Sequence, residues 1–204
     1  MKKSIGCFHA HYSNIVHVEH ALAPYEVELV HFVDPGLDRL KADADFTPQI
    51  AQKKVKDTLD WITACRADAI LITCTYFSAM IEDNLFSSVP VIAIDDPLFH
   101  LICESDKPYI LVFTNPETVD GTMNRLHLFS KRHGKAIQVQ PFLLENTFEL
   151  IMRGRQKEYT EKVAAELERL TAIHPDKAIS AAQLSMAPAA EIVEAKTGPL
   201  LEIT

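Results

Sequence analysis

The sequence predicts an α/β fold of two pseudo-symmetric lobes, each a parallel four-stranded sheet flanked by helices, with an active-site cleft between them. Strand-like and helix-like segments alternate almost throughout the 204 residues, a pattern typical of parallel sheets. The run at 69–72 is uniformly apolar, as expected for a strand covered on both faces. The second half then repeats the order of segments found in the first.

Short apolar runs predict the strands, and amphipathic runs predict the helices between them. In the first half we expect strands at 4–9, 25–33, 69–73 and 90–94, and helices at 14–23, 47–66 and 77–86. In the second half we expect strands at 109–114, 136–142, 178–182 and 200–203, and helices at 116–133, 146–153, 158–172 and 186–196. Pro116 suits a first helical turn, and Gly134 and Gly198 suit helix ends. The acidic stretch 34–45 is the longest expected loop, and Trp61 is expected in the core.

Four segments of the first half align with four segments of the second in the same order. Residues 68–74 align with 177–183, 25–30 with 135–140, 5–9 with 110–114, and 89–91 with 198–200. This internal repeat predicts lobe 1 at 1–96 plus 189–204 and lobe 2 at 97–188. It also places Cys74 and Gln183 at corresponding strand ends, where ligands of open α/β sheets bind.

Composition excludes several classes of function. A net charge of −8 and a pI near 5.6 argue against a nucleic-acid surface. No uninterrupted apolar stretch reaches 18 residues, and the N-terminus is too polar for a signal peptide. The four cysteines are expected as free thiols in the cytoplasm. With six glycines and no Gly-rich phosphate motif, no cofactor is expected.

Cys74 is the strongest candidate for chemistry. It follows the buried strand at 69–73 and precedes a turn into a helix, and a helix start favours the thiolate form. The other cysteines are expected to be structural, Cys7 within the first strand and Cys65 and Cys103 in helices. His9, His11, His17 and His20 lie close together in sequence, but their spacing lacks a matching carboxylate or thiol. No metal site is expected.

Five segments in order carry a family resemblance. They are Ile5-Gly-Cys-Phe-His9, Ile72-Thr-Cys-Thr-Tyr76, Pro90-Val-Ile-Ala-Ile-Asp95, Thr114-Asn-Pro-Glu-Thr-Val119 and Ala182-Gln-Leu-Ser-Met-Ala-Pro188. Through them the chain resembles the aspartate/glutamate/hydantoin racemase superfamily. That resemblance implies two similar lobes, often assembled as homodimers, and a small carboxylate or amide substrate. It implies cofactor-independent proton exchange at the α-carbon. From the charge and the lack of a long apolar stretch, we expect no nucleic-acid or membrane partner.

The resemblance also implies roles for individual residues. Cys74 matches the first catalytic cysteine, which exchanges the α-proton, and His9 and His11 lie in the strand-one loop that often carries an acidic residue. The carboxylate-binding Thr-x-x-Thr pattern matches Asn115 and Thr118. The remaining expected substrate-binding residues lie in the same loops and strand ends: Ser13, Asn14, Thr75, Tyr76, Thr114, Gln183 and Ser185.

Gln183 departs from the family pattern because it occupies the position of the second catalytic cysteine. An amide cannot hold or release a proton near neutral pH. Three alternatives stay open. His9 or His11 supplies a second acid/base; a single thiol protonates an enediolate left by loss of CO₂, as in arylmalonate-type decarboxylases; or the protein binds a small acid without turning it over.

Overall fold

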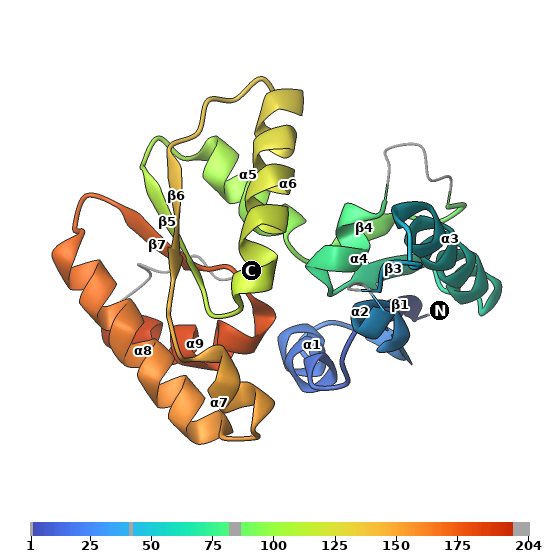
Figure 1. Cartoon of the computed structure of the whole chain (residues 1–204), viewed down its shortest axis with the longest axis horizontal. Coiled ribbons are helices and arrows are strands. Elements are labelled where there is room, and N and C mark those ends of the chain that lie inside the picture. Colours follow the sequence, from blue (N-terminus) through green and yellow to red (C-terminus); the bar gives the residue numbers. More distant parts are fainter. Residues whose placement is uncertain (1, 41–42, 82–86, 198–204) are drawn as a thin grey trace. The chain divides into compact units, whose positions relative to one another are not determined.

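The computed structural model describes residues 2–40, 43–81 and 87–197. The chain forms two compact units, Met1–Ile94 and Asp95–Thr204. Each unit has its own parallel sheet and its own buried core (Figure 1).

The first unit contains a four-stranded parallel sheet in the order β2-β1-β3-β4. Its strands are β1 (Lys3–His9), β2 (Val27–Val33), β3 (Ala69–Ile72) and β4 (Val91–Ala93). Its helices are α1 (Asn14–Leu22), α2 (Gly36–Leu40), α3 (Pro48–Ala64) and α4 (Thr75–Ala79). Thr47 caps the start of α3, where its hydroxyl accepts the Ile50 N–H, and Pro48 fits the first turn.

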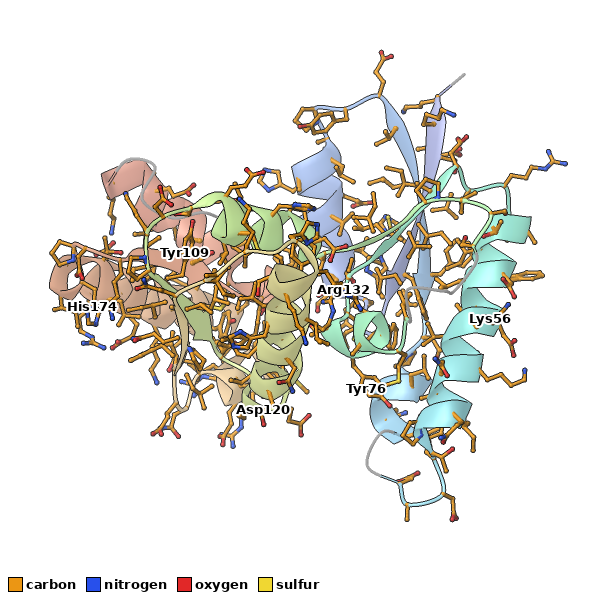
Figure 2. All side chains as sticks on the ribbon, turned by 90° about the horizontal axis from the view of Figure 1, so that it is seen from above. Lys56, Tyr76, Tyr109, Asp120, Arg132 and His174 are labelled. Carbon is orange, nitrogen blue, oxygen red and sulfur yellow. The ribbon has the colours of Figure 1, made fainter. Side chains whose placement is uncertain are left out.

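The apolar face of α3 packs on one face of this sheet. Val55, Leu59 and Ile62 of the helix are buried against Phe8 of β1 and Ile70 of β3. The opposite face of α3 carries exposed charges, including Lys56, whose side chain points away from the sheet (Figure 2). Side chains alternate along a strand, so the neighbours of Phe8 in β1 face the other side of the sheet.

The second unit contains a three-stranded parallel sheet among the described residues, in the order β6-β5-β7. Its strands are β5 (Tyr109–Phe113), β6 (Val139–Leu143) and β7 (Ala178–Ala181). Its α-helices are α5 (Asp96–Glu104), α6 (Val119–Arg132), α7 (Phe148–Met152), α8 (Gln156–Ile173) and α9 (Ala187–Thr197). A single 3₁₀ turn precedes α6 and another precedes α9: η1 (Pro116–Thr118) and η2 (Leu184–Met186).

Helices cover both faces of this sheet (Figure 1). Every residue of β5 is buried. Ile110 and Val112 pack with α8 and α9 on one face. On the other face Tyr109, Leu111 and Phe113 pack with α5 and α6, and Tyr109 is labelled within this unit in Figure 2. The sequence of β5 is therefore continuously apolar because both faces of this central parallel strand are buried.

The two sheets share a strand order, which supports the internal repeat. β1 and β5 are each flanked by the strand that follows them and by the next one along the chain. The Thr73 N–H donates to Phe8 O, and the Ala182 N–H donates to Val112 O in the same way. The register pairs Ile5 with Ala69 and Tyr109 with Ala178, so Ile5 corresponds to Tyr109, one residue earlier than the sequence alignment predicts.

The expected fold class is confirmed in its two helix-flanked parallel sheets. The expected strand at 200–203 lies outside the described residues. Within them, α5 has no counterpart among the expected helix ranges, although Cys103 was expected in a helix. α2 occupies part of the segment expected to be a loop. The predicted helix at 77–86 begins earlier, at Thr75, and α4 ends at Ala79. Residues 82–86 of this prediction lie outside the described residues.

Two further expectations differ from the structure. Trp61 was expected in the core but is 65% exposed, because it lies on the charged side of α3. Residues 189–204 were expected in lobe 1, whereas Ala189, Ala190 and Val193 of α9 pack in the core of the second unit with α8. Among the described residues, no helix has the length and apolar character needed to cross a membrane.

Candidate functional site

Cys74 occupies the end of β3 and caps the N-terminus of α4. Its backbone is extended, and its carbonyl accepts hydrogen bonds from both the N–H and the hydroxyl of Ser78, at 2.9 and 3.1 Å. The residue is half-buried. The next two residues, Thr75 and Tyr76, open the helix and are also half-buried. The expected cysteine at a strand end is therefore present, and its backbone is held by the turn that follows it.

Thr73, the residue before Cys74, is anchored by side chains from β1 and α1. Its hydroxyl lies 2.8 Å from Nδ1 of His9 and accepts a hydrogen bond of 3.1 Å from the Asn14 side-chain amide. It also lies 3.4 Å from the carbonyl oxygen of Phe8. Two expected site residues, His9 and Asn14, thus meet at Thr73, a residue that the sequence did not single out.

His9 is fully buried, and both of its ring nitrogens have partners. Nδ1 faces Thr73, and Nε2 lies 2.9 Å from Nδ1 of His31 in β2. Burial, together with the charge of His31, lowers the pKa of His9 to about 4. The imidazole is therefore neutral near pH 7. His31 was also missed by the sequence, where only its position opposite Cys7 in the β1–β2 register could have indicated it.

His11 and Ser13 form a separate pair in the loop between β1 and α1. The Ser13 N–H donates to Nδ1 of His11 (3.2 Å), and the Ser13 hydroxyl lies 2.8 Å from the same nitrogen. Because Nδ1 accepts a hydrogen bond from a backbone N–H, the neutral ring carries its proton on Nε2. His11 is exposed and its ring packs beside Tyr12. It is therefore the accessible histidine of the two expected at the site.

In the second unit, Gln183 is bound by three donors. Its Oε1 accepts hydrogen bonds from the Thr114 N–H (2.6 Å), the Thr114 hydroxyl (2.9 Å) and the Asn115 N–H (3.0 Å). Two backbone donors require an acceptor, so the orientation of the amide is determined. Its nitrogen then donates to the Thr118 hydroxyl at 3.2 Å. Four expected site residues are thus brought together around one carboxamide.

Ser185 joins the same network through Tyr159 of α8. The Tyr159 hydroxyl is 3.0 Å from Ser185 Oγ and 3.0 Å from Thr114 Oγ1. Since Thr114 donates to Gln183, it must accept from Tyr159, which in turn accepts from Ser185. Burial raises the pKa of Tyr159, so its hydroxyl keeps the proton this chain requires. Tyr159 was missed because a buried tyrosine in an amphipathic helix resembles ordinary core.

A cavity of about 350 Å³ opens beside this network, at the carboxyl ends of β5 and β6. Its volume lies at the small end of the range for small-molecule sites. It is lined by Thr114, Pro116, Leu143, Leu144, Glu145, Asn146, Phe148 and Glu149. The cavity therefore lies where a parallel sheet is expected to bind ligands.

The internal repeat relates the two networks. Cys74 and Gln183 each follow the third strand of their sheet in extended conformation and each cap a helical turn. His11 corresponds to Asn115, and the side chain of each accepts the backbone N–H two residues later. A thiol in one unit thus has a hydrogen-bonded amide as its counterpart in the other.

Solved structures with the same fold are racemases and a decarboxylase. The chain superposes on glutamate racemase from Francisella tularensis in complex with D-glutamate, with a TM-score of 0.63, 16% identity and coverage of 100% of this chain and 75% of that one. It superposes on an aspartate racemase homologue from Pyrococcus horikoshii with a TM-score of 0.63, 13% identity and coverage of 100% and 92%. For an arylmalonate decarboxylase the values are 0.62, 14%, 98% and 86%.

These likenesses confirm the fold expected from the racemase superfamily. No protein-family model matches the chain, and no curated protein sequence matches it.

Proposed function

We propose that this protein is a cofactor-independent, racemase-like enzyme that exchanges the proton on the α-carbon of a small carboxylic acid, amino acid or hydantoin. Cys74 is the thiol acid/base. The observation that carries the proposal is its half-buried position at the end of β3, in a fold shared with amino-acid racemases.

The chemistry requires a base that is fixed in place and partly shielded from water. An α-proton beside a carboxylate is very weakly acidic, so its removal needs a positioned base and donors for the enediolate that forms. The Cys74 thiolate takes the proton, and the electron pair of the C–H bond passes into the enediolate. The hydroxyl and N–H groups of Thr75 and Tyr76 are the nearest donors along the chain. His9 and Asn14 support the base indirectly, because they hold Thr73 beside it.

Full racemisation needs a second acid on the opposite face of the substrate. The Gln183 amide cannot donate or accept a proton as an acid or base near neutral pH. Its oxygen and nitrogen are already hydrogen-bonded to Thr114, Asn115 and Thr118. Of the two candidate histidines, His9 has both ring nitrogens engaged in the interior, whereas His11 is exposed with its proton on Nε2. We therefore assign the second proton transfer to His11 and a positioning role to His9.

The test is exchange of the α-proton in D₂O, followed by NMR over a panel of amino acids, hydantoins and small carboxylic acids. The wild type should incorporate deuterium, and Cys74→Ala should lower the rate by about 10³-fold, the scale of a general base. Cys65→Ala removes an exposed thiol elsewhere and should leave the rate unchanged. Absence of exchange with every compound, or full exchange in Cys74→Ala, would contradict the proposal.

A second candidate function is decarboxylation of a malonate-type acid. It is favoured by the single thiol, whose counterpart in the internal repeat is an amide, and by the structural likeness to arylmalonate decarboxylase. In this reaction the C–C bond to one carboxyl breaks, CO₂ leaves, and the Cys74 thiol protonates the enediolate and regains its proton from solvent. CO₂ release that is lost in Cys74→Ala, without α-proton exchange on amino acids, distinguishes this function from racemisation.

The third alternative is a binding protein without turnover. It predicts that a small acid raises the melting temperatures of the wild type and of Cys74→Ala equally. A ligand that binds the folded state stabilises that state whether or not it is turned over. Equal stabilisation with no product in either assay would replace both catalytic proposals.

A further inference from the structure

Three side chains with metal-binding atoms lie on one face of the first sheet. Cys7 and His9 are two residues apart in β1 and so face the same side of the sheet. His31 in β2 is the register partner of Cys7. The donor atoms of the three residues all lie within 4.8 Å of one another. The backbone register alone therefore brings a thiol and two imidazoles together.

The outer nitrogens of the two histidines differ in their surroundings. Nδ1 of His9 is 2.8 Å from the Thr73 hydroxyl. Nε2 of His31 is buried and has no hydrogen-bond partner among the described residues, and a carboxylate oxygen of Glu19 in α1 lies 3.7 Å away, beyond hydrogen-bond distance. The inner nitrogens, Nε2 of His9 and Nδ1 of His31, face each other at 2.9 Å. Metal-binding histidines characteristically donate their outer N–H to a carboxylate, carbonyl or hydroxyl acceptor, which fixes the ring orientation and the tautomer.

The burial of the cluster suits a metal ion that replaces a proton. Cys7 and His9 are fully buried and His31 is half-buried. The Cys7 sulfur makes a long hydrogen bond of 3.8 Å to the Ile5 carbonyl. In a tetrahedral zinc site, bonds of about 2.3 Å to sulfur and 2.0 Å to nitrogen place ligand atoms roughly 3.5 Å apart. Small side-chain rotations therefore convert the observed cluster into a coordination site.

We propose that Cys7, His9 and His31 bind a divalent, thiol-seeking metal ion of the zinc class. The thiolate selects such an ion over magnesium or calcium, which prefer oxygen ligands. The described residues supply three ligands, and water completes the coordination. The ion sets the position of His9 and, through Thr73, of the strand end that carries Cys74. Binding of the ion does not depend on which reaction Cys74 performs.

Metal binding changes the number of protons held by the three ligand side chains. A metal ion binds the thiolate form of cysteine, so the ion displaces the proton of the Cys7 thiol. The 2.9 Å contact between the inner nitrogens requires a proton on one of them. When the ion binds, this proton moves to the outer nitrogen of the same neutral ring, Nδ1 of His9 or Nε2 of His31. Each metal ion bound therefore releases one proton to solvent, from the sulfur.

The test is metal binding by the full-length chain after treatment with a chelator. Titration with zinc should reach one ion per chain, raise the melting temperature and release one proton per ion in weakly buffered solution. Cobalt, used as the probe for zinc, should give a thiolate-to-metal charge-transfer band. Cys7→Ala should abolish that band, and Cys7→Ala and His31→Asn should each weaken zinc binding at least tenfold.

Cys65→Ala and His20→Ala are the matched controls, since both remove exposed potential ligands from other parts of the first unit. They should bind zinc as the wild type does. Failure of the wild type to bind zinc or cobalt stoichiometrically would overturn the proposal. So would unchanged binding in both Cys7→Ala and His31→Asn, because the ion would then lie elsewhere.

Discussion

At the residue scale, Gln183 shows how one side chain can organise the end of a strand. A thiol at this position would make one weak hydrogen bond, whereas the carboxamide accepts three and donates one. The amide is thereby fixed in the position where Cys74 stands in the other unit. Its hydrogen bonds tie the end of β5 to the turn after β7, so Gln183 has a structural role whatever the substrate is.

Replacement of Gln183 by alanine should lower the free energy of unfolding by about 1–3 kcal/mol, because the backbone N–H groups of Thr114 and Asn115 lose their acceptor. Urea denaturation followed by circular dichroism measures the change. Gln183→Glu retains an acceptor oxygen and should cost less. Gln140→Ala, at an exposed position of β6, serves as the control and should change stability by less than about 0.5 kcal/mol. Equal stability of Gln183→Ala and the control would refute the structural role.

At the element scale, the contact between β1 and α3 depends on a glycine. A Cβ on Gly6 would collide with Cγ2 of Ile62 and would press on Cβ of Ala67. Ile62 is fully buried among the core side chains of this unit, so it cannot move aside without a cost. Close approach of helix and strand, and not a special backbone angle, is the reason for glycine here.

Gly6→Ala should therefore destabilise the protein by about 1–3 kcal/mol through overpacking. Ile62→Ala removes Cγ2, so the double variant should be no less stable than Ile62→Ala alone. The coupling is read from a double-mutant cycle in urea. Gly121→Ala in α6, where nothing lies within 4 Å of the added Cβ, should instead stabilise by about 0.5–1 kcal/mol. Additive losses for Gly6 and Ile62 would show that the two do not clash.

Sequence patterns predicted most elements because burial determines where apolar residues occur: continuously in a covered strand, and along one face of a surface helix. The all-buried strand β5 and the amphipathic helix α3 follow directly from such patterns. Cys74 was predicted at a strand end, and the structure has it there. His31 and Tyr159 were not predicted, because their importance comes from contacts between residues distant in sequence. Trp61 was placed wrongly, since large apolar size suggested core although its helix position faces solvent.

At the scale of the whole molecule, the internal repeat allows equivalent positions of the two units to be compared. Strand order, the hydrogen bonds that end β3 and β7, and the capping positions of Cys74 and Gln183 correspond between the units. Alignment by sequence found the correspondence of Cys74 and Gln183 but shifted β1 against β5 by one residue. Buried apolar strands resemble each other in any register, so only the hydrogen-bond pairing resolves such a shift.

The corrected register yields a substitution that separates structure from chemistry. His11 corresponds to Asn115, and each side chain accepts the N–H of the residue two positions later, from Ser13 in one unit and from Glu117 in the other. Asparagine at position 11 should therefore preserve the turn through its side-chain oxygen. It cannot transfer a proton near neutral pH.

The free energy of unfolding of His11→Asn should accordingly lie within about 0.5 kcal/mol of the wild-type value. Its rate of racemisation should fall at least about 100-fold, the lower end of the range for loss of a general acid. Proton exchange at the face served by Cys74 should persist, so deuterium should enter one enantiomer without inversion. NMR in D₂O measures exchange, and chiral chromatography measures inversion. His20→Asn, at an exposed position of α1, controls for loss of a surface histidine. Unchanged racemisation in His11→Asn, or parallel loss of exchange and inversion, would exclude His11 as the second acid.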